Sequence, residues 1–304
     1  MQAALSKKER SLTLLRDIID QEGTTLLACP YCHRPLNLVD QALRCDQGHH
    51  FDMAKQGYYY LTNIAQDSKY DQALLQARRK VIRDSDLFKE CHRVIQQVIT
   101  DRFSIQDQAL NILDAGSGEG SHLAQLVATW PKLGLAAGVD LSKQGVQLAS
   151  DYNGRFLSLV GDIANLPFQD DSFHVILSIL SPSNYDEFLR LAHPGESLLL
   201  KLVPNPAYLQ EIRQGVQALT GKSLMTYDNK PVLEGLRNHF HQSHFERISY
   251  TLPMSPEGMA NLVEMTPLTW QLSPELKASL VEDLNRQGTI TADWTLAIVE
   301  GMKA

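Results

Sequence analysis

A strand-and-helix alternation over residues 109–202 constrains the fold of this 304-residue chain more than any other feature of its sequence. Apolar runs typical of buried strands alternate with segments of helical periodicity, which predicts an α/β fold: a doubly wound, mostly parallel sheet with helices on both faces. Two later apolar runs, 245–252 and 294–299, predict strands that close the sheet edge. Within the series, the predicted strands are 109–114, 134–140, 156–160, 173–180 and 197–202, and the predicted helices are 120–130, 144–152 and 184–191.

A glycine-rich loop follows the first of these strands and opens a helix. Its sequence is Asp114-x-Gly116-x-Gly118-x-Gly120, in which the glycines allow a sharp turn and a close approach of the backbone to a ligand. Ligands of such sheets bind beyond the carboxyl ends of the strands. NAD-binding proteins and methyltransferases both carry glycine loops. The D-x-G-x-G-x-G spacing favours S-adenosylmethionine.

Acidic residues at the ends of the first three strands support the same cofactor. Asp114 can approach the methionine ammonium, and the carboxylate of Asp140 can accept both ribose hydroxyls. Asp162 is placed for the adenine amino group, and Leu141 and Ile163 could sandwich the adenine ring. Two alternatives stay open: a NAD-type Rossmann domain, which the glycine spacing fits poorly, and a plain loop cap at Asp114.

Four metal ligands precede this domain in two short knuckles, Cys29-Pro-Tyr-Cys32 and Cys45-Asp-Gln-Gly-His49. The twelve residues between the pairs are enough for a hairpin that brings them together. Thiolate and imidazole ligands in a tetrahedral array suit Zn²⁺, and four protein ligands leave no open position for catalysis. We therefore expect a structural zinc ion in a module too small to fold without it. The adjacent His50 could substitute for His49.

The composition excludes several classes of protein. Hydrophobic residues make up 43% of the chain and charged residues 21%, which is typical of a chain with a full core. No apolar run reaches the roughly 18 residues of a membrane span, and we expect no membrane partner. The N-terminus lacks a signal-peptide core, so we expect a cytoplasmic protein. Net charge is −7, but residues 1–102 carry 15 basic against 13 acidic side chains, a weak hint of phosphate contact.

We expect three parts: a helical extension over 1–27, a zinc-binding module over 28–66 and a cofactor domain over 67–304. The extension has an amphipathic helical pattern that stops at Gly23 and suits packing on a neighbouring domain or chain. Residues 73–103 predict a further helix, in which Cys91 is expected to be a buried thiol.

The glycine-loop domain resembles class I (Rossmann-like) methyltransferases over about residues 105–300. In that class the loop after the fourth strand faces the methyl acceptor; here it ends in Ser181-Pro-Ser183. This loop lacks the Asn/Asp-Pro-Pro-Tyr/Phe motif of exocyclic-amine methylation and the catalytic cysteine of pyrimidine C5 methylation. Ring-nitrogen or oxygen acceptors remain.

Several segments together resemble the RlmA family, the 23S ribosomal RNA guanine-N1 methyltransferases. They are the two zinc knuckles, Phe51-Asp-Met-Ala-Lys-x-Gly-Tyr58, Gln76-Ala-Arg-Arg79, the glycine-loop domain and Met265-Thr-Pro-x-x-Trp270. The resemblance covers residues 28–304 and implies S-adenosylmethionine-dependent methylation of guanine N1 in a hairpin of 23S ribosomal RNA. It also implies that the zinc module recognises RNA, and that a homodimer combines two such modules into one basic cleft.

The resemblance places the zinc ligands on Cys29, Cys32, Cys45 and His49. It places cofactor contacts on Gly118 and Glu119, near Leu87, and on Tyr208. The chain departs from the family pattern at Ser181, where alanine is usual, at Leu87, where an aromatic is usual, and at Tyr208, where histidine is usual.

Guanine N1 carries a proton at neutral pH, and its removal needs an acceptor within hydrogen-bond reach. The catalytic candidates are Asp52, Ser181, His122 and His174. Three of them have a structural alternative: Asp52 as a cap of the zinc hairpin, His122 as a packing residue, and His174 as a buried strand residue that faces away from the site. Release of the proton to water is the remaining route. Other functions left open are methylation of another RNA or a small molecule, and RNA binding without activity.

Arg78, Arg79 and Lys80 could grip RNA phosphate or form a solvated helix face. The late Met265–Trp270 segment could shape the acceptor pocket, where Trp270 would stack on a base or simply pack in the core.

Overall fold

The computed structural model describes residues 5–64, 71–103, 109–128, 130, 133–221 and 228–303. An eight-stranded sheet in the order β10-β11-β9-β8-β5-β6-β7-β4 forms its centre. Strands β4 to β9 run parallel, and β11 pairs antiparallel with both β9 and β10. The predicted doubly wound sheet and the closure of its edge are thus confirmed. The strands are β4 (Tyr59–Tyr60), β5 (Leu110–Ala115), β6 (Leu133–Asp140), β7 (Leu157–Val160), β8 (Val175–Ile179), β9 (Leu198–Pro204), β10 (Ser243–Pro253) and β11 (Thr289–Glu300).

Helices cover both faces of the sheet, because successive strand residues point to opposite sides. Ile112 faces a core built largely on α2, α3, α4, α9 and α10, whereas its neighbour Leu113 faces a core built on α1, α6 and α8. All six residues of β5 are buried, as expected for a central parallel strand. The helices are α1 (Lys7–Glu22), α2 (Gln72–Asp84), α3 (Lys89–Arg102), α4 (Ser121–Val127), α5 (Lys143–Ala149), α6 (Tyr185–Leu191), α7 (Gln210–Thr220), α8 (Lys230–His239), α9 (Pro256–Met265) and α10 (Pro274–Gln287), with short 3₁₀ turns η1 (Asp86–Phe88), η2 (Ser150–Tyr152) and η3 (Pro267–Thr269).

The predicted helix over 73–103 is two helices joined by a break. Ser85 adopts an extended conformation (φ −121°, ψ 161°), and its hydroxyl accepts a hydrogen bond from the backbone N–H of Leu87. Serine competes in this way with the helical backbone and so favours such breaks. The break turns η1 toward the carboxyl edge of the sheet and places Phe88 there.

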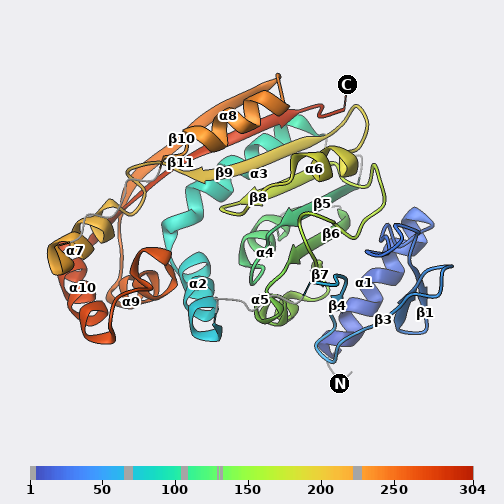
Figure 1. The fold of residues 1–304 in the computed structure, drawn as a ribbon, viewed down its shortest axis with the longest axis horizontal. Coiled ribbons are helices and arrows are strands. Elements are labelled where there is room, and N and C mark those ends of the chain that lie inside the picture. Colours follow the sequence, from blue (N-terminus) through green and yellow to red (C-terminus); the bar gives the residue numbers. More distant parts are fainter. Residues whose placement is uncertain are drawn as a thin grey trace.

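The zinc module lies at one end of the molecule beside α1, and α7, α9 and α10 lie at the other end (Figure 1). Its sheet consists of three short antiparallel strands, β1 (Asn37–Val39), β2 (Ala42–Arg44) and β3 (His50–Asp52). The next strand, β4, lies outside this small sheet and pairs with β7 of the large sheet. Asn165 also donates a hydrogen bond of 2.9 Å to the carbonyl of Pro30. The module is therefore joined to the large sheet by backbone and side-chain contacts.

The N-terminal extension packs against the large sheet as helix α1. Its start carries a capping box between Ser6 and Glu9, and Gly23 ends it in the left-handed conformation, as the sequence predicted. The hydroxyl of Ser11 donates to the carbonyl of Gly57, and Asn153 donates to the carbonyl of Lys7. The extension thus bridges the zinc module and the cofactor domain. Within the described part of the chain, no helix has the length and apolar character that crossing a bilayer requires.

Candidate active site and metal centre

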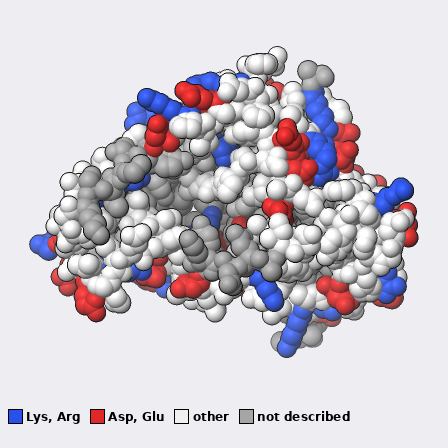
Figure 2. Space-filling view, viewed as in Figure 1, with Lys and Arg blue, Asp and Glu red and all other residues white. Residues whose placement is uncertain are grey.

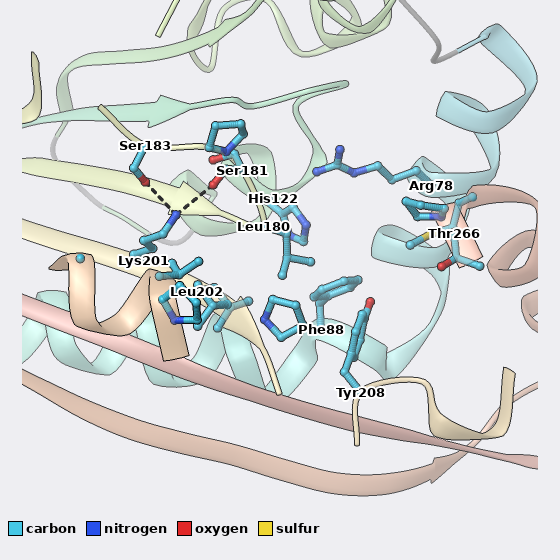
Figure 3. Close-up of a pocket in the computed structure, with 18 of the residues that line it drawn as sticks. Arg78, Phe88, His122, Leu180, Ser181, Ser183, Lys201, Leu202, Tyr208 and Thr266 are labelled. Carbon is cyan, nitrogen blue, oxygen red and sulfur yellow. Dashed lines mark hydrogen bonds between the residues drawn. The ribbon is translucent and has the colours of Figure 1, made fainter. Parts of the chain in front are cut away.

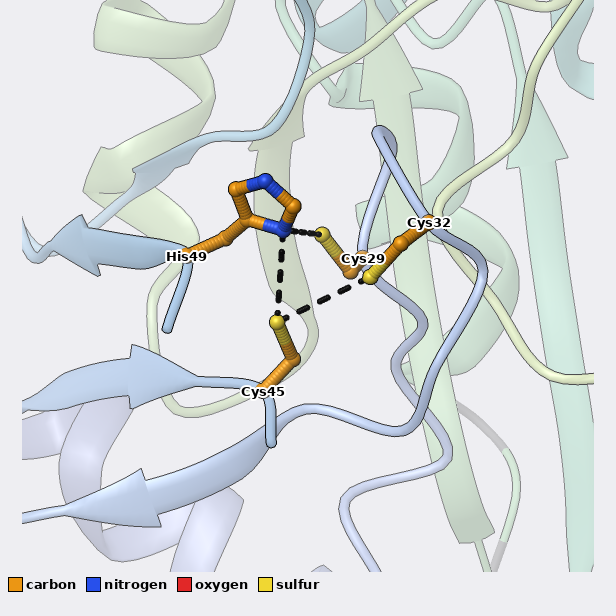
Figure 4. Close-up of side chains that lie close together, drawn as sticks. All are labelled: Cys29, Cys32, Cys45 and His49. Atoms are coloured by element: carbon orange, nitrogen blue, oxygen red, sulfur yellow. Dashed lines mark hydrogen bonds between the residues drawn. The ribbon is translucent and has the colours of Figure 1, made fainter. Parts of the chain in front are cut away.

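The side chains of Cys29, Cys32, Cys45 and His49 converge, with their ligand atoms all within 4.8 Å of one another (Figure 4). His49 Nδ1 lies 3.4 Å from the sulfurs of both Cys29 and Cys45, and the Cys32 and Cys45 sulfurs are 3.7 Å apart. A tetrahedral zinc ion with bonds of about 2.0–2.3 Å holds its ligand atoms roughly 3.5–3.8 Å apart. These three separations are close to those of a zinc site, so the donor set fits zinc.

The second knuckle turns on Gly48, whose φ of +84° favours glycine. This turn lets the backbone N–H of Gly48 donate to the carbonyl of Cys45 and returns His49 toward the sulfurs. His50, the alternative ligand, points elsewhere and bonds Asp52 Oδ1 at 2.8 Å. The geometry therefore selects His49.

The glycine loop lies at the carboxyl end of β5, beside the end of β6. Asp140 holds it in place: one carboxylate oxygen accepts from the N–H of Gly118 at 2.8 Å and the other from Ser142 at 2.7 Å. Burial raises the pKa of Asp140, while these two backbone N–H groups oppose the shift. A carboxylate has about four acceptor positions, so Asp140 keeps capacity for two hydroxyl groups of a ligand.

Asp114 is the buried acidic group at the end of β5. Burial raises its pKa to about 7, the positive charge of Arg78 opposes this shift, and the negative charges of Asp140 and Glu119 add to it. Its Oδ1 has no hydrogen-bond partner within the described parts of the chain. Buried polar atoms are normally paired, so an unpaired carboxylate oxygen at a ligand-binding edge suits a cationic group such as an ammonium.

A cavity of about 620 Å³ opens beyond the carboxyl ends of β8 and β9, within the usual range for small-molecule sites (Figure 3). In the space-filling view, the face turned toward the viewer is hollowed near its middle, and basic side chains lie inside the hollow (Figure 2). The lining residues that matter for chemistry are Arg78, Phe88, His122, Ser181, Ser183, Tyr185, Lys201, Tyr208 and Thr266.

The cavity adjoins the glycine loop through Ser181. The hydroxyl of Ser181 donates to the carbonyl of Ala115 at 2.7 Å, and a Cβ placed on Gly116 would lie 2.9 Å from Ser181 Oγ. A Cβ on that glycine would also reach Ile163 Cδ1 at 3.4 Å. Cofactor loop and predicted acceptor loop are therefore in direct contact.

Several residues predicted for the site line the cavity. Ser181, His122 and Tyr208 do so, as do Met265 and Thr266 of the late segment. His122 is buried on α4, its Nδ1 lies 2.9 Å from His92 Nε2, and its own Nε2 has no partner among the described residues. Burial lowers the pKa of both histidines, that of His92 to about 4. Both imidazoles are therefore neutral at physiological pH.

Other predicted residues lie outside the cavity. The side chain of Asp52 is 87% exposed on β3 in the zinc module, where it pairs with His50. His174 accepts from the backbone N–H of Asn111 and stacks on His193. Leu87 is fully buried in the core, and the next residue, Phe88, lines the cavity instead.

Two further cofactor candidates make local contacts. The carboxylate of Glu119 is held by Arg79 at 3.2 Å and by Ser121 at 2.6 Å, so its side chain is committed within the protein. Asp162 accepts from the backbone N–H of Ala164 in the turn after β7. Leu141 follows β6 and is half-buried.

The three consecutive basic residues of α2, Arg78, Arg79 and Lys80, make different contacts. Arg78 points into the cavity and would lie 2.8 Å from a Cβ on Gly118 (Figure 3). Arg79 is tied to Glu119 and Asp151, and Lys80 pairs with Glu257 at the surface. Only the first of the three is therefore available to a ligand in the cavity.

Sequence reasoning missed Lys201. It lies on β9 at 3% exposure, yet its amine reaches the cavity. The signal was a lysine in an otherwise apolar strand, Leu198–Val203, because a charged residue is seldom buried without a special reason.

Two family profiles match parts of the chain. Residues 27–66 match the family profile described as "RlmA, N-terminal", a zinc ribbon, and residues 112–194 match the profile described as "Methyltransferase domain". The "Putative 23S rRNA (guanine-N(1)-)-methyltransferase YxjB" of Bacillus subtilis (strain 168) is 34% identical over 92% of this chain and 98% of its own length. The "23S rRNA (guanine(748)-N(1))-methyltransferase" of Streptomyces fradiae is 29% identical over 90% of this chain and 95% of its own. Among solved structures, the plantazolicin methyltransferase BpumL in complex with SAH aligns over 76% of this chain with a TM-score of 0.43 and 15% identity.

Proposed function

Because this chain belongs to the RlmA family of 23S rRNA (guanine-N1)-methyltransferases, we propose that it transfers a methyl group from S-adenosylmethionine to N1 of a guanine in a hairpin of 23S ribosomal RNA. The observation that carries the proposal is the contact between the Asp114–Gly120 loop and a cavity at Ser181 whose volume of about 620 Å³ is large enough to admit a nucleobase. A methyl donor and an acceptor base held at these two places would be neighbours, and such alignment is the main requirement of an in-line transfer.

The residues present fit S-adenosylmethionine, which supplies an activated methyl group when bound. We assign the unpaired carboxylate of Asp114 to the methionine ammonium and Asp140 to the ribose hydroxyls. Asp162 would take the adenine amino group, between Leu141 and Ile163. Gly116 of the glycine loop joins the cofactor residues expected from the family, Gly118, Glu119 and Tyr208, and Phe88 takes the place expected for Leu87.

The zinc ion would organise the RNA-binding surface rather than take part in the reaction, because its four ligands close the coordination shell. Tyr31, between the first two cysteines, is 48% exposed and stacks on Phe51 with a centroid distance of 5.8 Å. The ring also lies 5.1 Å from that of His49, so we propose that its exposed part contacts a splayed-out base, the usual target of sequence-specific RNA recognition. The target guanine must itself be unpaired, since N1 lies on its pairing edge.

We also propose a homodimer acting in the cytoplasm. The family resemblance supports the dimer, and the ribosomal RNA substrate supports the location. Two exposed apolar side chains on and beside the zinc module, Val39 (39%) and Ile64 (43%), offer a contact surface. Light scattering of the purified chain should give twice its 34.1 kDa mass, and a monomer mass would contradict the dimer.

The function is tested with 23S RNA from cells that lack this protein. The purified protein is incubated with that RNA and labelled S-adenosylmethionine, and primer extension then locates any N1-methylguanine, which blocks reverse transcriptase. We expect one new stop in a hairpin loop together with label in the RNA. Label without a stop would indicate a different target atom. The absence of both label and stop would contradict the proposal.

A further inference from the structure

The acceptor side of the cavity contains a buried amine with no counter-ion. Lys201 Nζ lies 2.7 Å from Ser183 Oγ, 2.9 Å from the carbonyl oxygen of Ser181 and 3.2 Å from Ser178 Oγ (Figure 3). No carboxylate pairs with it in the parts of the chain that the structure describes. A buried, unpaired ammonium is unfavourable, so this environment favours the neutral amine. Burial accordingly lowers the pKa of Lys201 to about 8.

The three neighbours of Lys201 match the hydrogen-bonding pattern of a neutral amine. A neutral amine has two N–H donors and one lone pair. The carbonyl of Ser181 can only accept, so it takes one N–H, and the more distant hydroxyl of Ser178 takes the other. In the protonated form Nζ donates to the hydroxyl of Ser183, the nearest neighbour; in the neutral form the remaining lone pair faces that hydroxyl and accepts its proton.

Ser183 is the hydroxyl through which this amine can reach a substrate. Ser178 is fully buried beneath the loop, and the proton of Ser181 is donated to the carbonyl of Ala115. Ser183 is half-buried and lines the cavity. Its Oγ also lies 3.1 Å from Ser178 Oγ and its side chain bonds that of Tyr185, so a substrate N–H would reach Ser183 by displacing one of these two neighbours. The Lys201 amine itself has no free position, because its three partners fill it.

We propose that Ser183 and Lys201 form a proton relay that receives the N1 proton of the target guanine; this inference rests on the proposed function. The N1–H bond breaks as its proton passes to Ser183 Oγ, and the Ser183 proton passes to Lys201 Nζ. The N1 lone pair forms the new bond to the methyl carbon, and the methyl–sulfur bond breaks with its electron pair remaining on sulfur. One positive charge is lost at sulfur and one appears at Lys201, so the charge of the site is conserved.

Other titratable groups around the cavity are less suited to this role. Arg78 of α2 is cationic, and the pKa of His122 of α4 lies well below its usual range because the residue is buried. Burial raises the pKa of Tyr185 on α6, next to Ser183, and that of Tyr208, so neither offers a phenolate near neutral pH. The strand neighbours of Lys201 are Ser178 on β8 and Ala297 on β11, which add no charge.

The test is the pH profile of single-turnover methylation by the full-length, zinc-loaded protein with 23S RNA that lacks the modification. In the wild type the rate should rise with pH and level off above about pH 8, where the amine is neutral. Lys201→Met and Lys201→Arg should each be at least about 100-fold slower, because neither side chain can accept the proton. Ser183→Ala should lower the rate by a similar factor. The matched control Lys277→Met, on α10 and paired with Glu264, should keep the wild-type profile.

Three further measurements distinguish loss of the proton relay from misfolding of the variants and from failure of the proposed function. Cofactor binding by Lys201→Met, measured by calorimetry, should stay within about threefold of wild type. Carbon-13 resonances of lysine Cε should show one lysine titrating near pH 8 that disappears in Lys201→Met. If the wild type methylates guanine N1 but both Lys201 variants keep its rate and pH profile, or if no lysine titrates below pH 9, the relay is wrong. If the wild type forms no N1-methylguanine, the proposed function fails instead.

Discussion

Ser181 of the acceptor loop donates its hydroxyl to the carbonyl of Ala115 in the cofactor loop at 2.7 Å. This bond joins the two loops directly, so we expect a methyl donor held by the cofactor loop to lie next to the cavity. The contact leaves no room for a side chain on Gly116, whose φ of +86° also favours glycine.

Gly116→Ala should weaken S-adenosylmethionine binding at least tenfold. The added Cβ would lie 2.9 Å from Ser181 Oγ, so one of the two loops must move. The matched control is Gly221→Ala, which has a similar φ of +67° but open space around the Cβ. Calorimetry should show cofactor affinity lost in the first variant and kept in the second; equal affinities would mean that loop contact does not set the cofactor site.

Cys45→Ser should release zinc and abolish methylation of RNA while cofactor binding survives. The ligand cluster loses one of four sulfur and nitrogen donors, whereas the Asp114 loop lies in the large sheet. Zinc content by mass spectrometry and cofactor affinity by calorimetry check this. Cys91→Ala, in the core around α3, should keep its zinc. Loss of cofactor binding in Cys45→Ser would show that the β4–β7 pairing transmits unfolding of the module to the sheet.

Cofactor affinity should rise about tenfold between pH 6 and pH 8. The pKa of Asp114 is raised to about 7 in the folded protein, so the native state binds more protons than the unfolded state between about pH 4 and 7. Ionising Asp114 therefore lowers the free energy of unfolding of the ligand-free protein as pH rises through this window. A cationic ligand that binds the ionised form restores this free energy. Asp114→Asn should bind more weakly and with a nearly flat pH dependence. A flat wild-type profile would remove Asp114 from the ammonium site.

Tyr31→Ala should weaken RNA binding by about 1–3 kcal/mol, the usual value of a base–aromatic stack. The ring is 48% exposed and already stacked on Phe51, so it is rigidly presented. Leu5→Ala, an exposed apolar side chain before α1 without a π face, serves as the control. Fluorescence anisotropy with the hairpin RNA measures both, and equal affinities would place RNA contact elsewhere on the molecule.

The sequence predicted the parallel sheet well because buried parallel strands are continuous apolar runs, as in β5 and β9. It also predicted the metal cluster, because the spacing of the ligands within each knuckle does not depend on the conformation of the hairpin between them. Both signals are local in the sequence and need no knowledge of distant contacts.

The remaining features depend on contacts between distant segments. After the break at Ser85, Leu87 lies in the core and Phe88 lines the cavity, which the family resemblance had assigned to the vicinity of Leu87. Strand β4 is only two residues long, and its partner in β7 is a hundred residues away. The amine of Lys201 is hydrogen-bonded to Ser178 on β8 and to Ser183 in the following loop, and the sequence spacing of these residues does not reveal the contacts.

The central claim is that this protein makes N1-methylguanine in 23S ribosomal RNA. The most direct measurement is the N1-methylguanine content of 23S RNA, by mass spectrometry of a hairpin fragment, from cells with the gene deleted and then restored. We expect the modified nucleoside to disappear on deletion, to return with the wild-type gene, and not to return with Asp114→Asn. An unchanged N1-methylguanine content after deletion would contradict this claim.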